Sequence, residues 1–187
     1  MRIYTRKGDA GTTGLLFGGG RVSKADPRTD AGGTLDEAVS ALGLARASLG
    51  AGAAADDLPG LILRLQRELF VVGAEVATRT SRRDRLQAGR TLVTAEMVAA
   101  LEQLIDELEE RHPMPAEFVL PGESLAGAAL DLARSVVRRA ERRSVALVEG
   151  EILDAGSQVL PYLNRLADLL FVMARAADGG FQPVRTA

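Results

Sequence analysis

Residues 124–149 have the sequence SLAGAALDLARSVVRRAERRSVALVE, in which apolar residues recur at intervals of three and four. This spacing predicts one long amphipathic helix, because residues three and four apart share a helix face. Ser124 is a suitable N-cap for this helix. On a helical wheel, the predicted core stripe consists of Leu125, Ala129, Leu132, Val136 and Leu147.

Segments with the same periodicity lie on both sides of this helix. Thr34, followed by Glu37 in a capping-box arrangement, predicts the start of the first helix. Further helices are predicted over residues 58–78, 94–112 and 159–177, the last with Pro161 in its first turn. Long helices joined by short connections predict an all-α fold, a five-helix antiparallel bundle.

The 187 residues are expected to form a single domain with two parts. Residues 1–33 form an irregular, glycine-rich N-terminal segment, with an ordered loop or short hairpin after Gly8, and residues 34–177 form the helical bundle. Residues 79–91 are polar and are predicted to form a surface loop.

The composition excludes several classes of function. There is no cysteine, which excludes thiolate metal sites, disulfides and cysteine nucleophiles. The only histidine, His112, is a poor candidate for the base of a Ser-His-Asp triad. A net charge of −2 and 4% aromatic residues argue against nucleic-acid binding. No apolar run approaches the roughly 20 residues that span a bilayer, so we expect no membrane partner and a cytoplasmic protein.

The N-terminal segment carries cations among glycines and hydroxyls. Residues 5–14 read TRKGDAGTTG, and Lys7 and Lys24 are the only lysines of the chain. Such a loop can direct backbone N–H groups and a compact ammonium toward a phosphate. The segment lacks the Walker pattern, so a purely structural loop is the alternative.

The helix predicted over residues 124–149 carries a charged stripe. Arg134, Arg138, Glu141 and Arg142 share the face opposite the predicted core stripe. Arginines four residues apart repel unless an anion lies between them, and a triphosphate would serve. Glu141 could orient the arginines or hold Mg²⁺ through water. The alternative is a solvated charged face.

Polar residues of two further helices have no obvious local partner. Asn164, Asp168 and Arg175 share a face of a very apolar helix, so they are either satisfied core residues or groups that face a ligand. Asp36 lies in the first turn of the predicted first helix, where the helix dipole stabilises a carboxylate. It could equally meet an arginine of another helix or subunit.

Several short motifs occur in order along nearly the whole chain. They are IYTRKGDAG at residues 3–11, RVSK at 21–24, DE at 36–37 with SALG at 40–43, LQRELF at 65–70 with GAE at 73–75, FVLPG at 118–122, AR at 133–134, RRAERR at 138–143 and LNRLAD at 163–168. Together they resemble the PduO-type ATP:cob(I)alamin adenosyltransferases, and the co-occurrence of the last three is the most specific feature.

The resemblance implies transfer of the 5′-deoxyadenosyl group of ATP to cob(I)alamin, with release of triphosphate and formation of adenosylcobalamin. It implies a homotrimer with active sites between subunits, and Mg²⁺ beside ATP. Carried over by position, the ATP contacts are Thr5, Arg6, Lys7, Gly8, Thr13, Lys24, Arg138, Arg139, Glu141, Arg142 and Asn164. The residues expected to act in catalysis are Arg138, an Asp36–Arg134 pair across the interface, and Phe118 under the corrin ring.

The inferred chemistry suits the inventory of residues, because cob(I)alamin is itself the nucleophile and no general base is needed. The chain departs from the family pattern at Ala38 and Val39, at Asp131 where histidine is common, at Glu123 and at Lys7. A cobalamin-dependent mutase or its chaperone is a candidate partner. The alternatives are a non-catalytic, ATP-binding regulatory bundle and a structural interaction protein.

Overall fold

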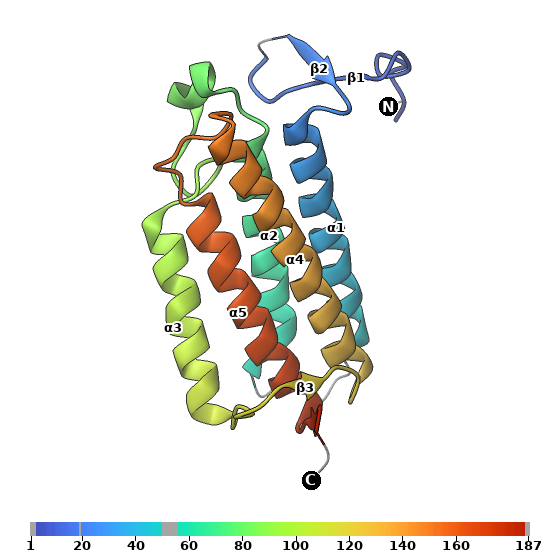
Figure 1. The fold of residues 1–187 in the computed structure, drawn as a ribbon, viewed down its shortest axis with the longest axis vertical. Coiled ribbons are helices and arrows are strands. Elements are labelled where there is room, and N and C mark those ends of the chain that lie inside the picture. Colours follow the sequence, from blue (N-terminus) through green and yellow to red (C-terminus); the bar gives the residue numbers. More distant parts are fainter. Residues whose placement is uncertain (1–2, 19, 50–55, 186–187) are drawn as a thin grey trace.

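The computed structural model describes residues 3–18, 20–49 and 56–185. Five long α-helices lie side by side and confirm the predicted all-α bundle (Figure 1). The helices are α1 (Pro27–Ser48), α2 (Leu58–Val76), α3 (Ala95–Arg111), α4 (Leu125–Glu149) and α5 (Val159–Asp178). No helix among the described residues is long and apolar enough to cross a membrane.

Helix α4 lies at the centre of the packing, between α1 and α5. In Figure 1, α1, α3 and α5 run in one direction and α2 and α4 in the other. The pairs α1–α2, α1–α4 and α4–α5 are therefore antiparallel, as predicted. The neighbours α3 and α5 are parallel, because α4 follows α3 in the chain and returns it to the end of the bundle where α3 began.

Helix α1 begins at Pro27, so the predicted start at Thr34 is wrong. The Asp26 carboxylate accepts a hydrogen bond from the Arg28 backbone N–H at 2.9 Å, and Pro27 occupies the first turn. Thr34 is instead fully buried inside the helix, where its hydroxyl donates to the Asp30 carbonyl. Packing against α4 outweighs the poor helix propensity of the two glycines before Thr34.

The other helix boundaries follow the sequence prediction closely. Thr94 caps α3 by accepting from the Met97 backbone N–H, and Ser124 caps α4 by accepting from the Gly127 N–H. Helix α5 tolerates Pro161 in its first turn and ends at Gly179, whose φ of 66° is left-handed. Local capping chemistry therefore sets these ends.

A short antiparallel hairpin, β1 (Thr12–Gly14) with β2 (Arg21–Ser23), precedes α1, so of the predicted alternatives, an ordered loop or a short hairpin, the structure has the hairpin. It lies beyond the end of the bundle where α1 begins (Figure 1). Leu16 attaches this segment to the end of α2, because its backbone N–H donates to the Ala77 carbonyl at 3.1 Å. At the opposite end of the bundle, β3 (Val119–Leu120) pairs with β4 (Gln182–Pro183).

The buried face of α4 differs in part from the predicted stripe. Ala129, Val136 and Leu147 are buried as expected, but Leu125 and Leu132 are 71% and 53% exposed. The core side is centred on small residues such as Ala133, Val137 and Ala140, which are fully buried. Small side chains let α1 and α5 approach α4 closely, and this rotates the two leucines out of the core.

Residues 79–91, predicted as a surface loop, contain a 3₁₀ helix, Thr80–Arg85 (η2), that is attached to the core through Glu75. The Glu75 carboxylate is buried on α2. It accepts hydrogen bonds from Arg83 at 2.8 Å, from the Val93 backbone N–H at 2.8 Å and from the Ser157 hydroxyl at 2.7 Å. The Glu75 carboxylate therefore attaches both the α2–α3 connection and the α4–α5 connection to α2.

We expect the substitution Glu75→Gln to lower the free energy of unfolding by about 2 kcal/mol, because a buried carboxylate loses its charge beside an arginine. Urea unfolding followed by circular dichroism measures this. Glu37→Gln is the matched control, since that ion pair with Arg139 is exposed and should contribute less than about 1 kcal/mol. Equal losses in the two variants would contradict the role assigned to Glu75.

Candidate functional site

The arginines of α4 divide into two groups according to their partners. Arg139 and Arg143 face α1, where they pair with Glu37 and Asp30. Within the described part of the chain, no carboxylate forms an ion pair with Arg134, Arg138 or Arg142. The structure therefore separates Arg139 from the other arginines that were expected to contact ATP.

Arg134, Arg138 and Arg142 follow one another at four-residue spacing and form an uncompensated cationic stripe along α4. Arg138 and Arg142 are exposed, and the Arg142 guanidinium donates to the Arg138 backbone carbonyl at 3.0 Å. Like charges one turn apart repel each other. A polyanion along this stripe would remove that repulsion and accept charge-assisted hydrogen bonds.

A chain of hydrogen bonds links α4, α5 and α3 beside this stripe. Asn164 donates to the Glu141 carboxylate at 3.0 Å and accepts from Arg165 at 2.8 Å. Arg165 in turn contacts Glu102 at 2.9 Å, and this hydrogen bond raises the pKa of Arg165. Asn164 and Glu141, both predicted site residues, are thus brought into direct contact.

The same contact bears on the expected Mg²⁺ role of Glu141. No group of three potential metal-ligating side chains occurs in the described ranges. Mg²⁺ usually keeps several waters and uses one or two carboxylates together with substrate phosphates. Glu141 fits that mode, because only its Oε1 atom is engaged by Asn164.

In the N-terminal segment, Arg21 organises the loop before the hairpin. Its guanidinium donates to the carbonyls of Lys7 and Thr12 at 2.7 and 2.6 Å. Lys24 lies against the same loop, since a Cβ added at Gly8 would lie 3.2 Å from the Lys24 Nζ atom. Two expected phosphate contacts, Gly8 and Lys24, are therefore adjacent.

The remaining members of this expected set are also on the loop and the hairpin. Thr5 accepts a weak hydrogen bond from the Lys7 backbone N–H, and the Arg6 guanidinium lies 5.5 Å from the centre of the Tyr4 ring. Arg6 has a φ of 58°, in the left-handed region. Thr13 lies in β1 opposite Val22. The segment is a folded loop with exposed cations, which is one requirement for anion binding.

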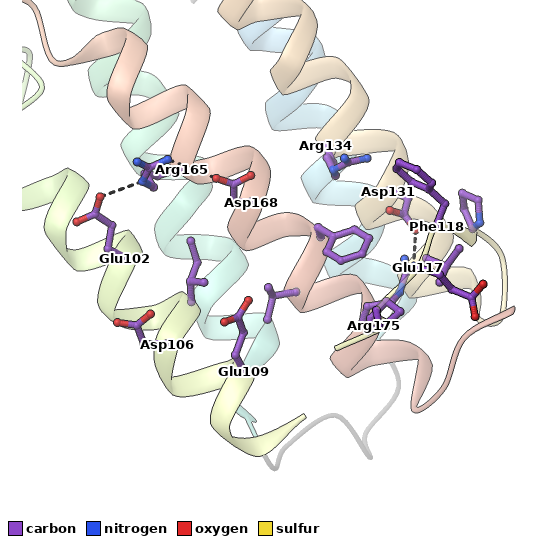
Figure 2. Close-up of a pocket in the computed structure, with 17 residues that line it drawn as sticks. Glu102, Asp106, Glu109, Glu117, Phe118, Asp131, Arg134, Arg165, Asp168 and Arg175 are labelled. Atoms are coloured by element: carbon purple, nitrogen blue, oxygen red, sulfur yellow. Dashed lines mark hydrogen bonds and ion pairs between the residues drawn. The ribbon is translucent and has the colours of Figure 1, made fainter. Parts of the chain in front are cut away.

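A cavity of about 730 Å³ opens between α3, α4, α5 and the segment before β3. Figure 2 shows Asp106 and Glu109 of α3 on one side and Arg134 of α4 and Arg175 of α5 on the other, while Arg165 of α5 contacts Glu102 of α3. Phe118, Arg134 and Phe171 are among its lining residues. A cavity of this size accommodates a large organic ligand.

Phe118 is the most unusual member of the lining. Its side chain is 88% exposed, although its backbone carbonyl is held by the Val184 N–H at 2.9 Å. An aromatic ring presented by a fixed backbone to an open cavity is typical of a ligand contact. The structure thus places Phe118 and Arg134 on one cavity.

The predicted site is not complete within one chain. The β1–β2 hairpin lies where α1 begins, whereas β3, which follows Phe118, lies at the opposite end of the bundle (Figure 1). Asp36 is exposed on α1, and among the described residues it forms no ion pair with Arg134. This chain therefore brings Phe118 together with the stripe of Arg134, Arg138 and Arg142, but not with the N-terminal loop or Asp36.

Sequence reasoning missed two structural supports of the site. Arg21 was part of a recognised motif without an assigned role. Asp131 was noted only as a departure from the family pattern, and it forms a buried ion pair with Arg175. The sequence did contain a signal for this ion pair, because Asp131 and Arg175 each lie among apolar residues of a predicted helix. Buried charges are usually paired with a charge of opposite sign.

This chain is similar in sequence to known proteins of one family. The family model described as cobalamin adenosyltransferase matches residues 3–177. The corrinoid adenosyltransferase of Bacillus subtilis (strain 168) is 41% identical over 95% of this chain and 87% of the relative. The corrinoid adenosyltransferase of Citrobacter freundii is 43% identical, with 95% of both chains covered.

A solved structure is similar over the whole chain. It is a variant of the PduO-type ATP:corrinoid adenosyltransferase from Lactobacillus reuteri, complexed with cobalamin and ATP, with a TM-score of 0.87 and 29% identity. The alignment covers 99% of this chain and 100% of that one. The helical bundle and the matching sequence define the class of corrinoid adenosyltransferases. This chain belongs to the cobalamin adenosyltransferase family.

Proposed function

We propose that this chain transfers the 5′-deoxyadenosyl group of ATP to cob(I)alamin. The electron pair of the substrate's Co(I) forms the bond to C5′, the C5′–O bond breaks, and triphosphate leaves with the bonding electrons. The observation that carries the proposal is the uncompensated stripe of Arg134, Arg138 and Arg142 beside a cavity that presents Phe118. It combines a site for a polyanion with a site for a large ring.

In this reaction, the protein's main task is to hold the triphosphate. Negative charge gathers on the leaving group, and guanidiniums fixed on a helix stabilise it without reorganising. Arg138 and Arg142 fit this role because they are exposed and have no carboxylate partner in the described structure. The Glu141–Asn164 contact lies next to them, and Glu141 would hold Mg²⁺ through water.

Phe118 would lie under the corrin ring and displace the lower axial ligand. An apolar ring at that position excludes water and disfavours a fifth ligand, which makes the Co(I) state easier to reach. The exposure of Phe118 in the free chain supports this role, because a ring that is 88% exposed gains contacts only when a ligand arrives.

We infer a homotrimer with active sites between subunits, as the family resemblance implies. The support in this chain is that the N-terminal loop and the Phe118 end of the cavity lie at opposite ends of one bundle (Figure 1). A second copy would supply Thr5, Lys7, Gly8 and Lys24 to the phosphates, and Asp36 to Arg134. A cytoplasmic location and a cobalamin-dependent mutase or its chaperone as partner stay predictions.

An anaerobic assay tests the proposed function. Protein, ATP, Mg²⁺ and chemically reduced cobalamin should yield the absorption spectrum of adenosylcobalamin and one triphosphate for each product. Chelation of Mg²⁺ with EDTA should slow the reaction, because the metal neutralises phosphate charge. ATP binding without any product under strict anaerobiosis would favour the non-catalytic regulatory bundle instead.

A further inference from the structure

A buried network of charges lies beside the cavity, at the end of the bundle near β3. Arg175 of α5 contacts the Asp131 carboxylate of α4 at 2.5 Å and the Asp178 carboxylate at 3.0 Å. The side chains of Arg175, Asp131 and Asp178 are 3%, 8% and 1% exposed. Figure 2 shows the contact of Asp131 with Arg175 beneath Phe118 and Arg134.

The first turn of α4 is built to hold this network. The Ser124 hydroxyl donates to Asp178 at 2.7 Å while it also caps the helix. Gly127 leaves the space that Asp178 fills, because a Cβ at that position would lie 1.9 Å from the carboxylate oxygen. Any larger residue at 127 would therefore displace Asp178, so the position of this carboxylate is tightly determined.

The network reaches Arg134 through one aromatic ring. The guanidinium of Arg175 lies 5.2 Å from the centre of the Phe171 ring, and that of Arg134 lies 5.4 Å from the same centre. Both distances are within the range of cation–π attraction. Phe171 and Arg134 line the cavity, and so do Arg175 and Asp131.

Two guanidiniums share the Phe171 ring, but only Arg175 is paired: both carboxylates contact it, and no carboxylate among the described residues forms an ion pair with Arg134. Without the charge of Asp131, the buried Arg175 would be less neutralised and would repel Arg134 more strongly across a medium of low dielectric constant. Arg134 is the more exposed of the two arginines and would be the one to move.

We propose that Asp131 is a positioning residue that holds Arg134 at the cavity, acting through Arg175 and the Phe171 ring. The inference rests on the proposed function, in which Arg134 contributes to catalysis. It adds an intrasubunit device to the expected Asp36–Arg134 contact between subunits. In this role Asp131 acts through Arg175, which its carboxylate contacts at 2.5 Å.

A double-mutant cycle on the full-length protein tests this. Asp131→Asn should lower kcat/KM for reduced cobalamin about tenfold, with the KM for ATP unchanged. Arg134→Ala should lower it further, and adding Asp131→Asn to Arg134→Ala should change nothing more. Phe171→Leu keeps an apolar side chain but removes the aromatic ring, and it should lower kcat/KM as Asp131→Asn does. Because this variant retains every buried charge, its effect cannot come from an unpaired charge.

Glu75→Gln is the matched control, because it also removes a buried carboxylate from an arginine, but near the C-terminal end of α2 and outside the cavity lining. It should lower stability and leave kcat/KM unchanged. Additive effects of Asp131→Asn and Arg134→Ala, or of Phe171→Leu and Arg134→Ala, would overturn the inference while leaving an active wild-type enzyme. An inactive wild type would instead overturn the proposed function.

Discussion

Replacing Arg138 by alanine is expected to reduce kcat/KM at least about 30-fold, which corresponds to about 2 kcal/mol of lost transition-state stabilisation. The physical reason is that an exposed guanidinium in the middle of an uncompensated stripe loses its charge-assisted hydrogen bonds to the leaving triphosphate. Steady-state formation of adenosylcobalamin under anaerobic conditions measures the loss, and the urea midpoint should not change.

Arg82→Ala is the control for Arg138. It removes an exposed arginine of the 3₁₀ helix Thr80–Arg85, which lies on no wall of the cavity. Activity of this variant should equal that of the wild type. If Arg138→Ala kept wild-type kinetics, the arginine stripe would be a solvated helix face and the proposed phosphate site would be wrong.

Replacing Phe118 by alanine is expected to lower kcat/KM for reduced cobalamin by about tenfold to a hundredfold, from the roughly 1.5–3 kcal/mol that a buried aromatic contact contributes. The KM for ATP should stay constant, because Phe118 lines the cavity whereas Arg138 and Arg142, the proposed triphosphate contacts, do not. Stability should also stay constant, since the ring is almost fully exposed in the free chain.

Phe70→Ala is the control for Phe118, because Phe70 is also a largely exposed phenylalanine, 66% accessible, but lies on α2 outside the cavity. Its kinetics should match the wild type. Equal kinetics for Phe118→Ala and the wild type would show that the ring does not contact the corrin. A parallel rise in the KM for both substrates would point to a general rearrangement of the cavity.

Helices α2 to α5 were predictable because their signals are local. Ser124 and Thr94 cap their helices with their own side chains, and the apolar spacing records which face packs inward. The start of α1 was not predictable in this way. Gly32 and Gly33 lower helix propensity, and the helix persists because Ala31 and Thr34 are buried against α4.

The candidate site was also predictable only in part from local sequence. That α4 carries an arginine-rich face opposite an apolar one follows from helix geometry. Which arginines remain unpaired does not, because Arg138 and Arg139 are neighbours in the chain and differ only in that α1 brings Glu37 to one of them. Likewise, the exposure of Leu132 depends on how closely α1 and α5 approach α4.

The order of residues by itself determined the helical class, most helix ends and the supply of cations, since these depend on contacts within a few residues along the chain. Only the packing of the helices decided that Arg139 is paired, that Asp131 meets Arg175, and that Phe118 opens onto a cavity with Arg134. These contacts join residues far apart in sequence, and their geometry depends on the distances and rotations between whole helices.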